Sequence, residues 1–140
     1  MTLYPSEKRN KTMQVFFFKF AVMLSGLSVG LGAFAAHGLK QRLSPEMLDV
    51  FKTGVQYQFY HALALLALSL ASTTFWQQPA TVKAASCWVI GIALFSGSLY
   101  ALSLSGISKL GAITPIGGVA LLLGWAFLFF ASRGLIDTPK

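Results

Sequence analysis

The sequence predicts an all-α integral membrane protein, a four-helix bundle with a short interfacial helix between the first and second spans. Of the 140 residues, 55% are hydrophobic and only 11% are charged, and the mean hydropathy is +0.66. Four long apolar runs hold most of the hydrophobic residues, and the charged residues lie mainly between them. A single domain of this size has too little interior to hide so much apolar surface from water. We therefore expect the lipid bilayer to be its solvent.

The first span is expected at residues 16–36, after a polar N-terminal tail at residues 1–12. A helix of this length rises about 31 Å, which is enough to cross a hydrocarbon core of about 30 Å. The triplet Ala33-Phe34-Ala35 imitates a signal-peptide cleavage site. However, the apolar run is longer than the ~7–15 residues typical of a signal peptide, so we expect a retained span.

The connection after the first span is the most polar part of the chain, and it predicts the interfacial helix. Ser44, Pro45 and Glu46 form a good helix start, with serine as N-cap, proline in the first position and an acid in the first turn. Charged residues recur every third position among apolar ones, as in an amphipathic helix at a membrane surface. Helix from Pro45 can run without a break into the second span, expected at residues 55–72.

The third and fourth spans are expected at residues 84–104 and 113–131. They complete a transmembrane domain at residues 13–133, which a polar tail at residues 134–140 follows. Small residues recur on one face of three spans and predict close helix packing. These residues are Gly26, Gly30 and Ala33 in the first span, Ala93, Gly97 and Ala101 in the third, and Gly117 and Gly124 in the fourth.

The distribution of basic residues predicts the orientation of the chain. Four spans put both termini on one side of the membrane, and that side would carry seven basic residues against four on the other. The positive-inside rule then predicts that both termini are cytoplasmic. Because orientation accounts for the net charge of +7, we expect no nucleic-acid partner.

Several polar side chains would gather at the outer, non-cytoplasmic face of this bundle and form the candidate site. His37 ends the first span and His61 lies near the start of the second, so the two histidines of the chain would meet there. Polar side chains in a bilayer are costly unless they pair or line a wet cavity. The candidate cluster consists of His37, Gln56, Tyr57, Gln58, His61, Ser105, Lys109 and Thr114.

Several roles are open for this cluster. The simplest is structural, with Tyr57 and His61 paired four residues apart on one helix face. The same side chains could form a pocket for a quinone or a lipid headgroup, or a pH-sensitive switch. Haem ligation by the two histidines would need deeper burial, and a metal site would need Glu46 or Asp49 as a further ligand.

Enzymatic function has no support in the sequence. There is no nucleophile–base–acid set and no glycine-rich phosphate loop, so we expect no catalytic residues, no cofactor and no metal. The lone Cys87 forms no internal disulfide. All four acidic residues fall outside the spans, which argues against proton-coupled export. A channel or transporter at an oligomer interface stays open as a further alternative.

Four sequence blocks resemble those of a known family. The stretch from Gly32 to Leu39, GAFAAHGL, is similar to the family signature G-A-F-x-A-H-G-L. The stretch from Gln56 to Leu66 is similar to a second block, and residues 95–100 and 113–118, followed by Gly124 and Trp125, to the third and fourth. The family is domain-of-unknown-function family 423, the YgdD/YwdK-like inner membrane proteins, which are similar also to eukaryotic transmembrane protein 256.

This resemblance covers about residues 13–133 and implies a four-helix fold in the bacterial inner membrane, but no activity. We therefore expect a non-enzymatic accessory protein that acts through helix–helix or lipid contacts. Its expected partners are the lipid bilayer and a second copy of the chain or a larger membrane protein. The alternative is a quinone or lipid-headgroup site around the two histidines.

Overall fold

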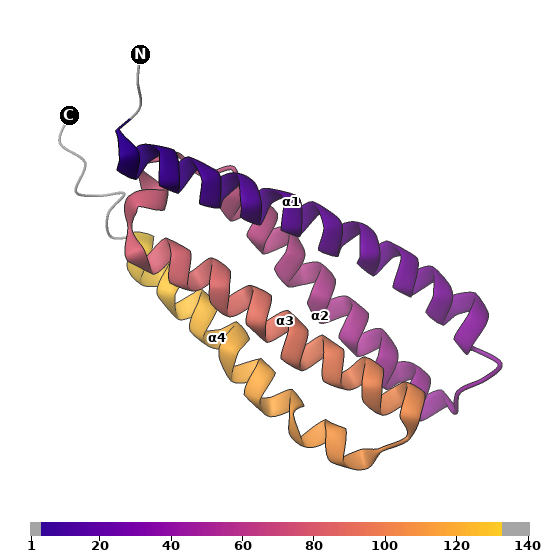
Figure 1. The fold of residues 1–140 in the computed structure, drawn as a ribbon. Helices are drawn as coiled ribbons and strands as arrows, with labels where there is room; N and C mark the ends of the chain where they lie inside the picture. Colours follow the sequence, from indigo (N-terminus) through magenta and orange to yellow (C-terminus); the bar gives the residue numbers. More distant parts are fainter. Residues whose placement is uncertain (1–3, 133–140) are drawn as a thin grey trace.

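The chain folds into four long helices packed side by side, as Figure 1 shows for a computed structural model that describes residues 4–132. The long helices are α1 (Pro5–Phe34), α2 (Pro45–Ser69), α3 (Pro79–Ser105) and α4 (Thr114–Ala131). Three short helices join them: the π-helix η1 (Ala35–Leu39) and the 3-10 helices η2 (Phe75–Gln77) and η3 (Ser108–Ala112). The start of α1 and the end of α4 lie at the same end of the bundle. The predicted all-α fold is confirmed.

Proline begins each long helix. It occupies one of the first two positions in all four, where its missing N–H is not needed for the helix ladder. The predicted start of α2 is confirmed, because the Ser44 hydroxyl accepts a hydrogen bond from the Met47 amide at 3.3 Å. Helix α3 ends at Gly106, whose φ of 71° is the left-handed conformation that favours glycine.

Helix α1 begins earlier than the expected span, so the segment expected as a polar tail is helical from Pro5 onward. A contact far along the chain holds this extension in place. The Gln14 side-chain amide donates to the carbonyls of Ser69 and Ala71, both at 2.8 Å. These carbonyls lie at the end of α2, where backbone acceptors lack helical partners.

Helix α2 also extends beyond its expected span, because it runs unbroken from Pro45 to Ser69. The interfacial helix expected between the first two spans is therefore the first part of α2. This difference changes the position of every polar residue on α2, since residues near its expected start lie well inside the helix.

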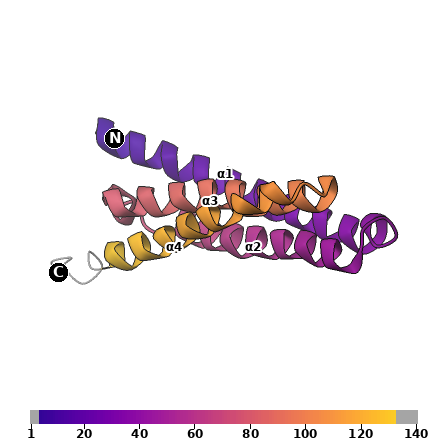
Figure 2. The same cartoon turned by 90° about the horizontal axis from the view of Figure 1, so that it is seen from below.

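The helices pack in the order α1, α2, α3, α4, and α3 and α4 lie closest together (Figures 1 and 2). Glycine permits this approach. A Cβ atom at Gly117 would lie 2.3 Å from the backbone nitrogen of Phe95, and one at Gly124 would lie 2.3 Å from Cδ1 of Trp88. A side chain at Gly117 would require α3 to move, and one at Gly124 would require the Trp88 ring to move.

Three helices in the described part of the chain are long and apolar enough to cross a membrane: Glu7–Leu39, Pro79–Ser105 and Ser108–Ala131. Helix α2 is not among them. Gln56, Gln58 and His61, which lie near its centre, lower its mean hydropathy. Both Gln58 and His61 are buried between helices, so they do not face lipid. A span within α2 stays a prediction.

Candidate functional site

The polar residues of α2 lie in the middle of the bundle and not at its outer face, where we expected them. Tyr57 is the central residue of α2, and its ring lies 4.6 Å from that of Phe95, near the middle of α3. Helix α2 begins at Pro45, so His61 lies sixteen residues into the helix. That is a rise of about 24 Å.

A buried hydrogen-bonded chain joins three helices at this depth. The Tyr100 hydroxyl of α3 donates to Oε1 of Gln58 at 2.9 Å, and Nε2 of Gln58 donates to the Leu24 carbonyl of α1 at 3.0 Å. The Ser28 hydroxyl donates to the same carbonyl at 2.9 Å. Gln58 is only 3% exposed. With both ends of its carboxamide satisfied, Gln58 is a structural link between the helices.

His61 lies one helical turn further along α2, and both of its ring nitrogens are engaged. Nδ1 lies 2.9 Å from the Tyr57 carbonyl oxygen, and Nε2 accepts from Nε1 of Trp125 at 3.1 Å. A carbonyl can only accept and an indole N–H can only donate. The two bonds together therefore fit one form of the ring, the neutral imidazole with its proton on Nδ1.

The rings of two tryptophans, Trp88 and Trp125, lie against the His61 ring. The rings of Trp88 and Trp125 lie edge to face with centroids 4.8 Å apart, and the Trp88 ring is 6.4 Å from that of His61. Trp88 is completely buried, and its indole N–H has no hydrogen-bond partner among residues 4–132. The absence of a side chain at Gly124 makes room for Trp88.

A groove of about 460 Å³ opens between α2 and α4 beside His61. Its walls are apolar except for the Tyr57 hydroxyl, the His61 ring and the Trp125 indole. Tyr57 is 40% exposed, and its hydroxyl donates to no group within residues 4–132. The lining residues are Tyr57, His61, Phe95, Pro115, Gly118, Val119, Leu121, Leu122 and Trp125.

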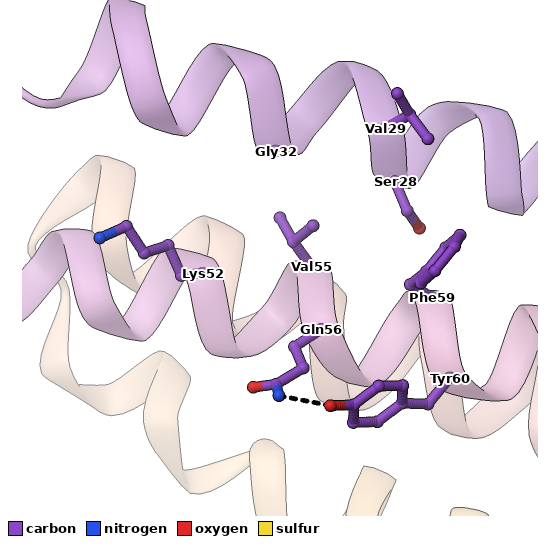
Figure 3. A pocket seen from close by; sticks show the side chains of 8 residues that line it. All are labelled: Ser28, Val29, Gly32, Lys52, Val55, Gln56, Phe59 and Tyr60. Carbon is purple, nitrogen blue, oxygen red and sulfur yellow. Dashed lines mark hydrogen bonds between the residues drawn. The ribbon is translucent and has the colours of Figure 1, made fainter.

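A second cavity, of about 300 Å³, lies between α1 and α2 (Figure 3). Ser28, Val29 and Gly32 of α1 face Val55 and Phe59 of α2 across it. Its remaining lining residues are Lys52, Gln56 and Tyr60, with the Gln56 amide donating to the Tyr60 hydroxyl at 2.6 Å. The Ser28 hydroxyl is already bonded to a carbonyl, so this cavity offers a ligand mainly apolar contact.

The structure does not bring the eight candidate residues together. His37 is exposed in η1 and is not a partner of His61, and Lys109 is exposed in η3. The Ser105 hydroxyl accepts from the Ile107 amide at the end of α3, and the Thr114 hydroxyl lies 2.7 Å from that of Ser98. Only Tyr57 and His61 share the groove, while Gln56 and Gln58 face other neighbours.

The small residues predicted for helix packing also separate into two groups. Gly117 and Gly124 lie buried in the α3–α4 contact. A Cβ atom at Gly26, Gly30 or Gly97 would meet nothing within 4 Å. The alanines Ala33, Ala93 and Ala101 are exposed on the surface of the chain.

Sequence reasoning missed the residues that surround His61. Trp125 was noticed only as part of a sequence block, and Trp88 and Tyr100 were not noticed as site residues. One signal was available: Gly117 and Gly124 are seven residues apart, so they share a helix face that a neighbouring helix or a large side chain can approach closely. Among residues 4–132, no three His, Cys, Asp or Glu side chains gather in a group that could hold a metal ion.

Comparisons with known proteins identify the family. A family model described as "Protein of unknown function (DUF423)" matches residues 31–118. The chain is 46% identical over 106 residues to the UPF0382 membrane protein YwdK of Bacillus subtilis, covering 76% of this chain and 86% of the relative. It is 45% identical over 112 residues to a UPF0382 membrane protein of Haemophilus influenzae, covering 79% and 89%.

A third relative is the UPF0382 inner membrane protein YgdD of Escherichia coli, which is 38% identical over 112 residues. The match covers 78% of this chain and 82% of the relative. No solved structure matches the chain. The family model carries no activity, and the relatives are named only as membrane proteins. This chain therefore belongs to the DUF423 family of small membrane proteins.

Proposed function

We propose that this protein is a non-enzymatic accessory protein of the bacterial inner membrane that acts through helix–helix contacts, with a second copy of the chain as its first partner. One observation carries the proposal. Gly26, Gly30 and Ala33 form an exposed stripe on α1, and a Cβ atom at either glycine would meet nothing within its own chain. This stripe is left unused by the fold.

The neighbours of the stripe favour a helical partner. Val22, Met23 and Val29 project from the same face of α1 and are 48%, 54% and 67% exposed. Small residues between larger apolar ones form a groove that a second helix can enter, and such packing drives helix association in lipid. The α3–α4 contact shows that this chain uses glycine in this way between its own helices.

Resonance energy transfer between labelled copies in dilute liposomes tests the proposal. Gly30→Leu should abolish the transfer, because its side chain fills the stripe. Gly97→Leu is the matched control, since it places the same side chain over open space on α3, and it should leave the transfer unchanged. Loss of transfer only with Gly97→Leu, or a wild-type protein that stays monomeric, would contradict the role of α1.

The groove beside His61 supports a second candidate function, the binding of a lipophilic molecule that carries a hydrogen-bond acceptor. Its polar groups lie at the middle of the bundle, and ionisable residues within membrane helices are often functional. A quinone carbonyl or a lipid carbonyl could accept from the free Tyr57 hydroxyl, with its apolar part against Val119 and Leu122.

Mass spectrometry of the organic extract of the purified protein tests this second candidate. The wild type should retain a quinone or a specific lipid, and Tyr57→Phe should lose it. Tyr60→Phe is the control, because Tyr60 is also exposed on α2 but lies outside the groove. An extract with no enriched compound, or equal retention by both variants, would rule out the site.

A further inference from the structure

A cavity at the terminal end of the bundle has a composition unlike that of the others. It measures about 490 Å³ and lies between the start of α1 and the segment from η2 into α3. Figure 1 shows that α1 and α3 both start at this end of the bundle. Two cations, Arg9 and Lys83, and two carboxamides, Asn10 and Gln77, line it. We call it the basic pocket.

Asn10 is the least expected member of the basic pocket. It is only 8% exposed, and its carboxamide makes no hydrogen bond within residues 7–132. Buried polar side chains are normally paired, because an unpaired one loses its hydrogen bonds to water without replacement. The Asn10 carboxamide lines the cavity, so it is a group to which a ligand can hydrogen-bond.

The two cations of the basic pocket also lack counterions. The ion pair of the described chain joins Lys52 to Asp49, at the other end of the bundle. Neither Arg9 nor Lys83 has a carboxylate within ion-pair distance among residues 4–132. The Lys83 amine lies 5.7 Å above the centre of the Phe127 ring, and this cation–π contact holds it near α4. The described lining of the pocket therefore holds two positive charges and no carboxylate.

The rest of the lining is apolar. Met13, Val82, Pro79 and Trp76 supply this apolar part. The Trp76 indole N–H is already bonded to the Leu68 carbonyl at 3.0 Å, so this ring presents an apolar surface. A lining that combines two cations and carboxamides with apolar side chains matches a molecule with an anionic head and a hydrocarbon tail.

We propose that the basic pocket binds the phosphodiester head of an anionic phospholipid. Arg9 and Lys83 would donate to the phosphate oxygens, because a guanidinium and an ammonium both form charge-assisted hydrogen bonds with phosphate. The Asn10 amide donates to the same head, and the first carbons of the acyl chains lie on Met13 and Val82. Basic pockets between membrane helices are known to hold such headgroups.

This proposal is independent of the self-association through α1 and of the groove beside His61. The basic pocket shares no lining residue with that groove, and the α1 stripe lies several turns away. Either of those roles can fail without affecting lipid binding here.

Native mass spectrometry tests the proposal on full-length protein released from nanodiscs that hold equal amounts of phosphatidylglycerol and phosphatidylcholine. We expect bound phosphatidylglycerol to exceed phosphatidylcholine. Arg9→Gln and Lys83→Gln should each reduce that excess roughly tenfold, which corresponds to the loss of one charge-assisted hydrogen bond. Asn10→Leu should also reduce it, although this variant leaves the net charge unchanged.

Lys8→Gln and Lys11→Gln are the matched controls. Both side chains are exposed on the same part of α1 and lie outside the basic pocket. They should change the excess by less than about twofold. An equal loss in all lysine and arginine variants would show a diffuse effect of charge and overturn the site. Equal binding of the two lipids would do the same.

A competition experiment separates the lipid from a free anion. Millimolar inorganic phosphate should not displace bound phosphatidylglycerol, because the acyl chains contribute to binding. Displacement by phosphate alone would overturn the assignment to a lipid and indicate a site for a small anion. Because Arg9 and Lys83 are both exposed, their variants should fold normally, and circular dichroism checks this.

Discussion

Gln58 shows how one side chain fixes three helices. Its carboxamide accepts from Tyr100 of α3 and donates to the Leu24 carbonyl of α1, while its own backbone belongs to α2. In lipid there is little hydrophobic force to hold helices together, so such bonds add to packing. They also set the position of each helix along its neighbours, because each bond has one geometry.

Replacing Gln58 with leucine should therefore destabilise the fold by about 1–3 kcal/mol, because the Tyr100 hydroxyl loses its acceptor. Unfolding in mixed micelles, followed by circular dichroism, measures this. Gln56→Leu is the control. Its carboxamide bonds to the exposed Tyr60, and the substitution should cost less than about 0.5 kcal/mol. Equal effects of the two variants would show that the buried chain is not a structural link.

At the scale of elements, α3 and α4 form the closest contact of the fold, and adjacent glycines in α4 play different parts in it. A Cβ atom at Gly117 would lie 2.3 Å from backbone of Phe95, whereas one at Gly118 would lie 3.7 Å from the same residue's ring. The first distance is a clash with backbone atoms, which no change of side-chain rotamer can relieve. The second is an ordinary contact.

This difference predicts opposite outcomes for two neighbouring substitutions. Gly117→Ala should destabilise the protein by about 1–3 kcal/mol, because α4 must move away from α3. Gly118→Ala should be neutral or stabilise by up to about 1 kcal/mol, since alanine favours helix over glycine. Thermal unfolding in detergent compares the two. A Gly117→Ala protein as stable as wild type would mean that α3 and α4 do not approach so closely.

The sequence predicted the helical elements better than their ends and contacts. The proline and serine signals placed the start of α2, because capping is local chemistry. Local patterns could not extend α1 to Pro5, since Gln14 finds its partners more than fifty residues away. They also could not show that Gly117 is packed and Gly30 is open, because both lie in equally apolar runs.

At the scale of the whole molecule, the antiparallel order of the helices sets the topology. The start of α1 and the end of α4 lie at one end of the bundle. In the described chain this end carries Lys8, Arg9, Lys11 and Lys83. The proposed orientation places this end in the cytoplasm, where the positive-inside rule puts basic residues and where the basic pocket meets anionic lipid.

Fusions of two reporters test this topology. Green fluorescent protein, which is fluorescent only in the cytoplasm, should light up at either terminus. Alkaline phosphatase, which is active only outside the cytoplasm, should work when inserted after Arg42 or after Gly106. Phosphatase inserted after Thr74, in the connection between α2 and α3, should be inactive. The reverse pattern would invert the orientation, and termini on opposite sides would show that α2 does not span.

The hydrogen bonds of Gln14 affect the order in which the helices can pack during synthesis. Helix α1 emerges first, but the Ser69 and Ala71 carbonyls that its amide binds are made only at the end of α2. Once these residues are made, the hairpin of α1 and α2 can form the Gln14 hydrogen bonds before any of α3 is synthesised. A gene split between α2 and α3 should therefore yield an N-terminal fragment that is stable in the bilayer and can later associate with the fragment that contains α3 and α4. A split between α1 and α2 divides the partners of these hydrogen bonds between two products.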